Sequence, residues 1–245
     1  RSTDLGATWV PVSHFQAVFN SDLTKASSVG FSSDGVTVFF SSGGINPKRS
    51  IDNGVNFTNI SMGLQTGEII KYWTPDSSNP LVLYAGTNKG LLVTNDKGLS
   101  WARVSGISEE SIGTFINQGS TNKRIYHSGR TKIYYSDNNG ASFATYYTPT
   151  GINIRQFAGG ADISGTTLSF GDNDGANACS WAFTYINDWG QASVDNTVAN
   201  CGYVWVSVNG GAFVKKMQSV GDHLKMAEND STTIYSTGST KWLRG

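Results

Sequence analysis

A motif of eight residues occurs five times along this 245-residue chain, and an internal repeat constrains the fold of a chain more strongly than its composition does. The motif reads Ser/Thr-x-Asp-x-Gly-x-Ser/Thr-aromatic. The fourth copy has Asn in the Asp position, and the fifth is degenerate and one residue short. The copies are Ser2–Trp9, Ser50–Phe57, Thr94–Trp101, Ser136–Phe143 and Ser207–Phe213.

The spacing of the copies predicts one structural unit for each motif. The copies begin at residues 2, 50, 94, 136 and 207, so the intervals are 48, 44, 42 and 71 residues. A unit of four short strands needs ~40–50 residues. The long interval therefore predicts an insertion of roughly 25–30 residues within one unit.

The motif resembles the Asp-box, or BNR repeat, of sialidases, xyloglucanases and sortilin-type receptors. The resemblance covers essentially the whole chain, but as a marker of fold. It implies an all-β protein, a β-propeller of four-stranded antiparallel blades in which each box is the turn between the third and fourth strands. We expect one propeller domain over residues 1–245, with the insertion at roughly 172–201. The structural box positions are Asp4, Asp52, Asp96, Asn138 and Asn209.

The residue types of the motif suit such a turn. A short Asp or Asn side chain can accept backbone N–H groups of its own turn, and glycine adopts backbone angles that a side chain opposes. We therefore interpret the acidic positions as turn residues rather than catalytic acids. The closing aromatic residue is expected to be buried between neighbouring sheets; these residues are Trp9, Phe57, Trp101, Phe143 and Phe213.

The ends of the chain are predicted to complete one blade together. Residues 232–238 and 241–244 resemble the strands that precede the other boxes, but no box follows them. Counted through the two termini, the fifth box and the first are 40 residues apart. We therefore expect five blades in a closed ring, which removes exposed sheet edges. The alternative is five units of a longer repeat protein.

Charge and cysteine content bound the partners. Eighteen basic and 18 acidic residues leave no excess charge for nucleic acid, and no apolar run is long enough to cross a membrane. Cys179 and Cys201 form either a disulfide or two buried thiols. Glycosylation triplets begin at Asn56, Asn59 and Asn229. Together these features favour a secreted protein.

The resemblance implies that function lies on the face opposite the boxes, which is built by the loops that join second to third strands and by those that join blade to blade. Four of those loops carry a lysine: Gly43–Lys48, Gly86–Lys89, Gly129–Lys132 and Gly238–Lys241. We predict a cationic rim that binds carboxylated or sulfated sugars. The alternative is that each lysine only solubilises its turn. The rim residues are Lys48, Lys89, Arg130, Lys132 and Lys241.

We predict that the ligand site lies beside the insertion, on the same face as the lysine rim. Sugars stack on flat aromatic rings with a polar edge, and carboxylates bond to sugar hydroxyls. The alternative is that the rings form a small satellite core. The segment from Asp172 to Gly175 also resembles the start of a calcium loop, but a plain polar turn is the expected interpretation and we predict no cofactor. The candidates are Trp181, Tyr185, Trp189, Asp172 and Asp174.

The sequence favours a binding protein over an enzyme. Sialidases need three arginines, a Tyr–Glu pair, an acid Asp and an Arg-Ile-Pro motif, and that motif is missing. His127 is a conceivable base for a polysaccharide lyase, although a hydrogen-bonded strand residue is the expected interpretation. We predict a lectin-like, carbohydrate-binding propeller. The alternatives are a glycan-cleaving enzyme (a glycoside hydrolase or polysaccharide lyase), a fragment of one, or a protein-binding propeller. Two facing buried carboxylates would favour hydrolysis.

Overall fold

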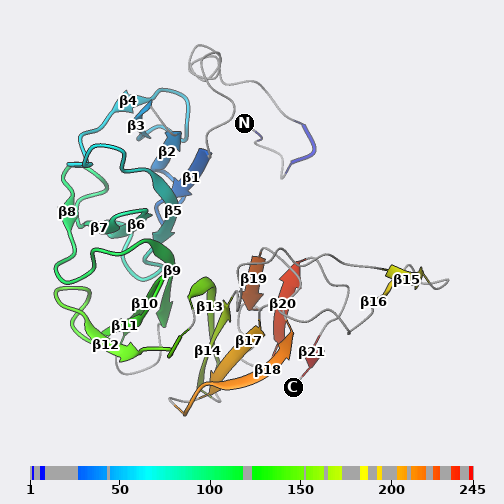
Figure 1. Cartoon of the computed structure of the whole chain (residues 1–245). Coiled ribbons are helices and arrows are strands. Elements are labelled where there is room, and N and C mark those ends of the chain that lie inside the picture. Colours follow the sequence, from blue (N-terminus) through cyan, green and yellow to red (C-terminus); the bar gives the residue numbers. More distant parts are fainter. Residues whose placement is uncertain are drawn as a thin grey trace. The chain divides into compact units, whose positions relative to one another are not determined.

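The chain is all-β in the residues that the computed structural model describes, and no helix occurs among them (Figure 1). It forms two compact units, Arg1–Ser111 and Ile112–Gly245. The described residues are 2, 6–8, 27–42, 45–117, 123–151, 153–162, 165–172, 183–186, 192–194, 203–208, 211–218, 223–226, 233–237 and 243–244.

The first unit contains two four-stranded antiparallel sheets with strands in sequential order. The first sheet consists of β1 (Ser27–Phe31), β2 (Val38–Ser42), β3 (Ile45–Ser50) and β4 (Thr58–Asn59). The second sheet consists of β5 (Ile70–Pro75), β6 (Leu83–Thr87), β7 (Gly90–Thr94) and β8 (Ala102–Arg103).

The second unit repeats this arrangement. One sheet contains β9 (Ser111–Asn117), which starts at the last residue of the first unit, β10 (Arg124–Gly129), β11 (Ile133–Ser136) and β12 (Ala144–Tyr147). The next contains β13 (Ile154–Asp162), β14 (Gly165–Asp172), β17 (Tyr203–Val208) and β18 (Val214–Gln218). Between β14 and β17 lies a two-stranded sheet of β15 (Phe183–Ile186) and β16 (Ala192–Val194).

The described part of the last sheet has three strands, β19 (His223–Met226), β20 (Thr233–Thr237) and β21 (Leu243–Arg244). The residues after Trp9, which the sequence predicts to pair with this sheet, lie outside the described residues. The shared blade and the five-blade ring therefore stay predictions.

Antiparallel order fixes which connections share an end of each sheet. The chain reverses at every connection, so the turns after the first and third strands lie at one end and the turn after the second strand lies at the other. The motifs Ser50–Phe57 and Thr94–Trp101 connect β3 to β4 and β7 to β8. We call this the motif end of the first unit and the other end the opposite end.

Aromatic side chains join the two sheets of the first unit. Phe39 of β2 stacks on Trp73 of β5 with ring centroids 5.4 Å apart, and Trp101 meets them edge-on at 5.9 and 5.8 Å. Gly30 of β1 provides the room, because a Cβ there would come within 2.4 Å of Trp73 Cβ. Central strands β2 and β6 are buried along their whole length, so these strands show no alternation of exposed and buried residues.

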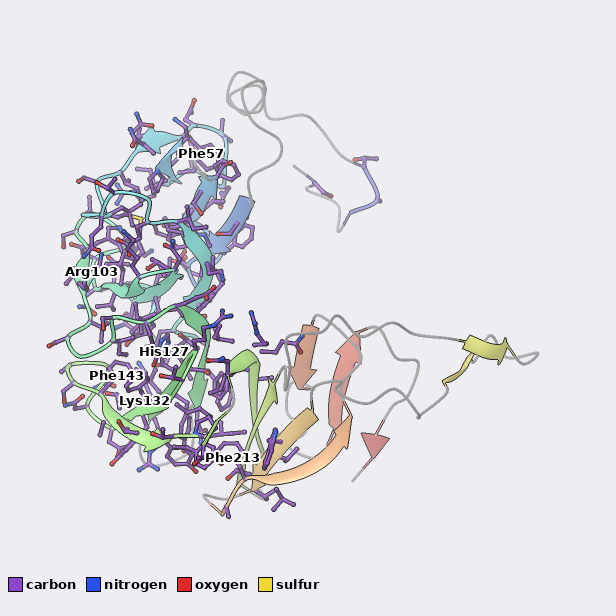
Figure 2. The ribbon with its side chains drawn as sticks, viewed as in Figure 1. Phe57, Arg103, His127, Lys132, Phe143 and Phe213 are labelled. Atoms are coloured by element: carbon purple, nitrogen blue, oxygen red, sulfur yellow. The ribbon has the colours of Figure 1, made fainter. Side chains whose placement is uncertain are left out.

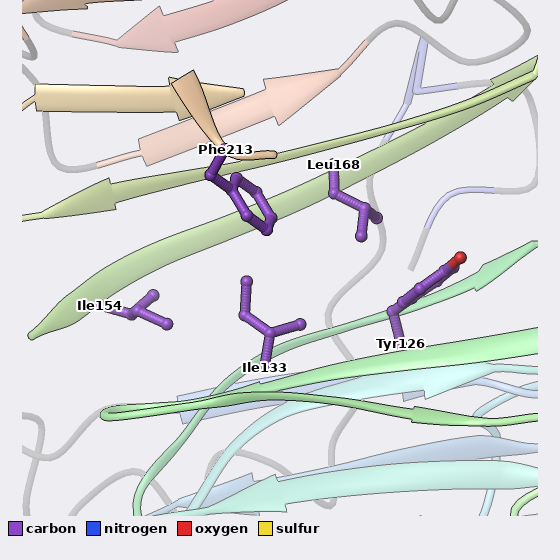
Figure 3. Packing of buried hydrophobic residues seen from close by; sticks show 5 residues of the cluster. All are labelled: Tyr126, Ile133, Ile154, Leu168 and Phe213. Carbon is purple, nitrogen blue, oxygen red and sulfur yellow. The ribbon is translucent and has the colours of Figure 1, made fainter. Parts of the chain in front are cut away.

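A second core lies in the second unit, between the sheet that starts at β9 and the sheet that starts at β13 (Figure 3). Phe213, from the fifth motif, lies 4.6 Å from the Tyr147 ring. Gly159 of β13 faces Phe115 of β9, and a Cβ there would fall 2.2 Å from Phe115 Cδ1. The cluster contains Tyr126, Ile133, Ile154, Leu168 and Phe213.

The motif forms the same turn wherever its eight residues are complete and described. Ser50 Oγ accepts the Gly54 N–H at 2.8 Å and donates to Asp52 Oδ1 at 2.6 Å, and Asp52 Oδ1 accepts the Asn56 N–H at 2.9 Å. Asn53, before the glycine, has a φ of 56°. The third and fourth copies repeat these bonds around Asp96 and Asn138.

The two end copies differ in what is described. In the first copy Gly6 N–H donates to Ser2 Oγ at 2.8 Å, as in the complete turns, whereas Asp4 lies outside the described residues. In the fifth copy Ser207 Oγ instead donates to the Gly211 carbonyl at 2.5 Å. Gly211 stands four residues after Ser207, as the glycine does in the complete copies, but its N–H donates to the Val208 carbonyl at 2.9 Å. This turn therefore has a different hydrogen-bond pattern. Asn209 lies outside the described residues.

The expected burial of the motif aromatics is only partly right. Phe213 is 8% exposed, but Phe57, Trp101 and Phe143 are only half-buried. The outer strands β4 and β8, which follow two of these rings, have only two residues each, so they leave one side of the ring in contact with solvent. Trp9 lies outside the described residues.

Candidate ligand-binding pocket

A pocket of about 200 Å³ lies in the first unit at the opposite end, away from the motif turns. One wall comes from the end of β2 and the start of β3, and the other from the segment that links β4 to β5 and from the start of β5. The resemblance to Asp-box propellers predicts function at this end of the sheets, where second strands are joined to third strands and one blade is joined to the next. The lining residues are Ser41, Ser42, Asn46, Pro47, Leu64, Glu68, Ile69 and Ile70.

The accessible lining combines neutral polar groups with aliphatic surface. Asn46 lines the pocket with an exposed side chain that carries an amide, whereas Ser41 and Ser42 are buried at the end of β2. Ser41 Oγ shares a 3.0 Å hydrogen bond with Ser28 Oγ of β1. Ile69 is 38% exposed. An amide and hydroxyls beside aliphatic carbon can bind a small polar molecule with both hydroxyl and C–H faces.

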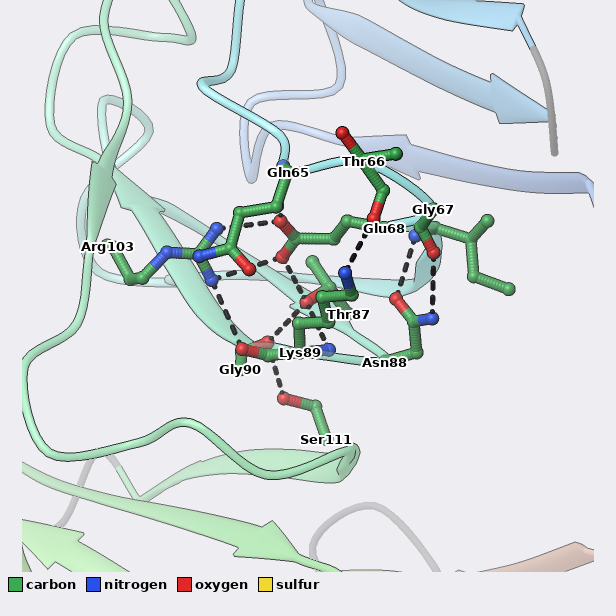
Figure 4. Close-up of polar contacts among 11 residues, drawn as sticks. Gln65, Thr66, Gly67, Glu68, Thr87, Asn88, Lys89, Gly90, Arg103 and Ser111 are labelled. Carbon is green, nitrogen blue, oxygen red and sulfur yellow. Dashed lines mark hydrogen bonds and ion pairs between the residues drawn. The ribbon is translucent and has the colours of Figure 1, made fainter.

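Glu68 supports the pocket wall from behind, because its side chain has no exposed surface. Its carboxylate accepts hydrogen bonds from Arg103 Nη2 at 2.7 Å, Thr87 Oγ1 at 2.6 Å and the Gln65 N–H at 2.8 Å (Figure 4). Burial opposes ionisation, but the hydrogen bonds from Arg103, Gln65 and Thr87 outweigh it and lower the Glu68 pKa. The carboxylate therefore stays ionised and is a structural acceptor, not a proton donor.

The same network fixes the loop beside the pocket segment. Asn88 Oδ1 accepts the Ile69 N–H at 2.8 Å, and Asn88 Nδ2 donates to the Gly67 carbonyl at 3.1 Å. Arg103 Nη1 reaches the Lys89 carbonyl at 3.2 Å, and Ser111 Oγ donates to the Gly90 carbonyl at 2.8 Å. The connection between β6 and β7 is therefore tied to the segments before and after its own sheet (Figure 4).

The two predicted rim lysines of the first unit serve local structure. Lys89 lies in the predicted loop, but its Nζ donates to the Thr66 carbonyl at 2.5 Å. Lys48 does not lie in a loop as expected, because β3 already begins at Ile45, which pairs with Ser42. Its Nζ donates to Asn59 Oδ1 of β4 at 2.7 Å. The Gly43-Gly44 dipeptide favours a two-residue connection, which moves Lys48 into the strand.

The remaining predicted residues belong to the second unit. Arg130 and the exposed Lys132 lie in the connection between β10 and β11 (Figure 2). Asp172 ends β14 and Tyr185 lies in β15. Outside the described residues are Trp181, Trp189, Asp174, Lys241, Cys179 and Cys201, so the aromatic site, the disulfide and the plain polar turn after Asp172 stay predictions.

His127 is a core residue. It lies in β10 with no exposed surface, and its Nδ1 is 3.0 Å from Thr114 Oγ1. Burial lowers the His127 pKa to about 3, so the ring is neutral at physiological pH. A fully buried ring cannot reach a polysaccharide in this conformation, which argues against His127 as a lyase base.

The described buried carboxylates do not form a hydrolytic pair. Glu68 precedes β5 and Asp76 follows it, so an extended strand separates them by roughly 20–25 Å at ~3.3 Å per residue. Glycoside hydrolysis needs two carboxyl groups within ~10 Å. Among the described residues no three His, Cys, Asp or Glu side chains gather as a metal site. The described part of the chain also contains no helix long and apolar enough to cross a membrane.

Sequence reasoning missed Asn46 and Glu68. Asn46 lies within the segment Gly43–Lys48, but only the lysine of that segment was predicted to bind a ligand. Glu68 is the only acidic residue between Asp52 and Asp76, and an isolated acidic residue in a connection between two sheets is a signal that could have found it. Its partners Thr87 and Arg103 are too distant in sequence to be recognised without the sheet.

No family model and no curated protein matches this sequence. Similar solved structures include the GH74 enzyme of Niastella koreensis, with a TM-score of 0.55 and 13% identity. The match covers 83% of this chain and 34% of that enzyme. YCF48 bound to D1 peptide matches with a TM-score of 0.51 and 11% identity over 85% of this chain and 59% of that one. The Dos1 propeller matches with a TM-score of 0.50 and 13% identity over 86% and 66%.

The chain thus spans about a third of the length of the GH74 enzyme. At these identities the likeness concerns the fold and not the activity. Consecutive antiparallel four-stranded sheets and the similarity to known propellers together show that this protein has a β-propeller fold.

Proposed function

We propose that this protein is a secreted, lectin-like β-propeller with Asp-box blades. We propose further that it binds carbohydrate at the opposite end of the first unit, with the pocket beside Asn46 as one binding site. The observation that carries the proposal is the composition of the pocket: an exposed amide and two serines beside aliphatic side chains. Sugars present hydroxyls and C–H groups together, so a lining of this kind matches both.

The position of the pocket supports the same function. The motif turns are saturated by their own hydrogen bonds, which leaves few groups there for a ligand. The opposite end instead holds a segment fixed by Glu68 and Asn88, and a preorganised wall reduces the entropy lost on binding. The similar structures include a GH74 glycoside hydrolase but also a propeller with a bound peptide, so a glycan partner is the hypothesis to test.

A glycan array of neutral and acidic glycans tests the function, followed by calorimetry with the strongest hit. Asn46→Ala should weaken binding at least tenfold, about 1.4 kcal/mol, without lowering the melting temperature, because Asn46 is exposed. Asn95→Ala is the matched control, because Asn95 is an exposed asparagine at the motif end. An array without hits contradicts the function, and equal affinity of Asn46→Ala and wild type contradicts the site.

Two further outcomes separate the alternatives. Cleaved products after hours of incubation would favour a glycan-cleaving enzyme over a lectin. The sequence predicts a ligand site beside the insertion, so replacing Trp181 and Trp189 by Ala should weaken glycan binding at least tenfold with an unchanged melting temperature. A fall in melting temperature would instead assign those rings to a satellite core.

A further inference from the structure

The pocket also indicates which sugars it accepts. We propose that it is a subsite for a single uncharged pyranose ring and that it discriminates against sugars carrying a carboxylate or sulfate group. This inference rests on the proposed function and narrows it, because the lysine rim predicted from the sequence would favour acidic glycans instead.

The size of the pocket limits the ligand to about one ring. Its volume is about 200 Å³, below the ~300–1,000 Å³ of sites that enclose drug-sized molecules. An oligosaccharide bound here would place one ring in the pocket and leave the others over the surrounding surface. Selection by charge therefore acts on that one ring.

The lining offers no cation to an acidic sugar. Among its eight residues the only charged one is Glu68, and none is Lys, Arg or His. Moving a carboxylate or sulfate out of water without a charged partner costs free energy, and hydrogen bonds from a neutral lining do not offset that desolvation cost. A neutral hydroxymethyl group pays a much smaller desolvation cost and can bond to an amide or hydroxyl.

The basic side chains of the neighbouring sheet already have partners. Arg103 is bound to Glu68 through both Nη atoms, Lys89 is bound to the Thr66 carbonyl, and Lys71 is paired with Glu110. Redirecting Arg103 to a ligand would leave Glu68 buried without its counter-ion, which is strongly unfavourable. The ion pair thus stabilises the wall, and because the Arg103 guanidinium is bound to Glu68 it is not available to a ligand in the pocket.

Two matched ligand pairs test the inference on the full chain: methyl β-D-glucoside with methyl β-D-glucuronide, and the corresponding galactoside with galacturonide. Each pair differs only in a hydroxymethyl or carboxylate group. We expect the neutral member of at least one pair to bind, and its acid to bind at least tenfold more weakly by calorimetry. Shifts of the Asn46 side-chain amide in NMR spectra report that the ligand is in this pocket.

A gain-of-function variant supplies the missing cation. Ile69→Lys adds an ammonium group to the lining at a partly exposed position whose backbone N–H, not its side chain, bonds to Asn88. We expect it to raise uronide affinity at least threefold relative to the neutral sugar. Leu81→Lys is the control, because Leu81 is 46% exposed at the motif end of the same sheet, and it should leave the ratio unchanged.

The outcomes distinguish the inference from the function on which it rests. A uronide that binds wild type as tightly as its neutral partner overturns the charge selection while leaving carbohydrate binding intact. Array hits combined with no binding of either neutral glycoside at Asn46 overturn the pyranose subsite but not the lectin. An array without hits removes the function itself. An equal change of the ratio in Ile69→Lys and Leu81→Lys would mean that overall charge, not the lining, sets selectivity.

Discussion

Replacing Glu68 by Gln tests whether one buried carboxylate holds the pocket wall in place. The substitution keeps the size of the side chain but replaces one oxygen by an NH₂ group. That group then faces donors, either Arg103 Nη2 with the Gln65 N–H or Thr87 Oγ1 with Arg103 Nη1. It also removes the counter-ion of Arg103, whose side chain is 29% exposed.

Breaking a buried ion pair costs ~3–5 kcal/mol, and partial exposure of Arg103 places the expected loss at the lower end, about 3 kcal/mol. Thr87→Val removes one neutral donor to the same carboxylate and should cost about 1–2 kcal/mol. Urea unfolding, followed by tryptophan fluorescence, measures both losses from the shift in midpoint at unchanged slope.

The pH dependence gives a second readout of the same carboxylate. Because the folded pKa of Glu68 is lowered, its contribution to stability is complete above the unfolded pKa of about 4.3. That contribution is lost as pH falls through the lower folded value. Wild type should therefore lose more stability than Glu68→Gln below pH ~4. A loss below 1 kcal/mol at pH 7, or identical acid sensitivity of the two proteins, would refute the role assigned to Glu68.

Three further perturbations test the core and the motif. The His127 pKa is lowered to about 3, so the unfolded state takes up a proton that the folded state does not, and stability should fall by about 2 kcal/mol between pH 6.5 and pH 5; His127→Asn should abolish much of this slope, and an unchanged slope would contradict the assignment. Gly30→Ala would place a Cβ 2.4 Å from Trp73 Cβ and should cost about 1–3 kcal/mol, measured by the unfolding midpoint; a neutral effect would mean that β1 and β5 are not packed this closely. Trp101→Ala removes a half-buried ring that packs edge-on against Phe39 and Trp73 and should cost about 3 kcal/mol; a loss below 1 kcal/mol would show that the ring is not packed.

The motif turns could be predicted because their interactions are local. Every bond that defines the turn after Ser50 joins residues at most four positions apart, so the residue types alone specify it. In the fifth copy, which is one residue shorter, the Ser207 hydroxyl donates to the Gly211 carbonyl instead. The repeat spacing then predicts four-stranded sheets, and the similarity to propellers supports that fold.

The sheet register decided the position of Lys48. The lysine lies after a Gly-Gly pair. From the sequence alone, such a pair is compatible with a long loop and with a two-residue hairpin connection. Pairing of Ser42 with Ile45 selects the hairpin, and the register shift between Phe40 and Ser42 adapts the strands to it. Lys48 then lies opposite Asn59, so its side chain links two strands, and its contact with a ligand stays a prediction.

What the sequence by itself determined is the repeating turn, the succession of short strands and the end of each sheet at which the motif lies, because these depend on hydrogen bonds within eight residues and on simple reversal of the chain. Only the tertiary structure decided where the pocket forms. Its walls come from residues 41, 42, 46 and 47 on one side and 64 and 68–70 on the other, and its support joins Glu68 to Arg103 over 35 positions. Contacts between such distant segments exist only once neighbouring sheets have packed, and no local pattern of residues encodes them.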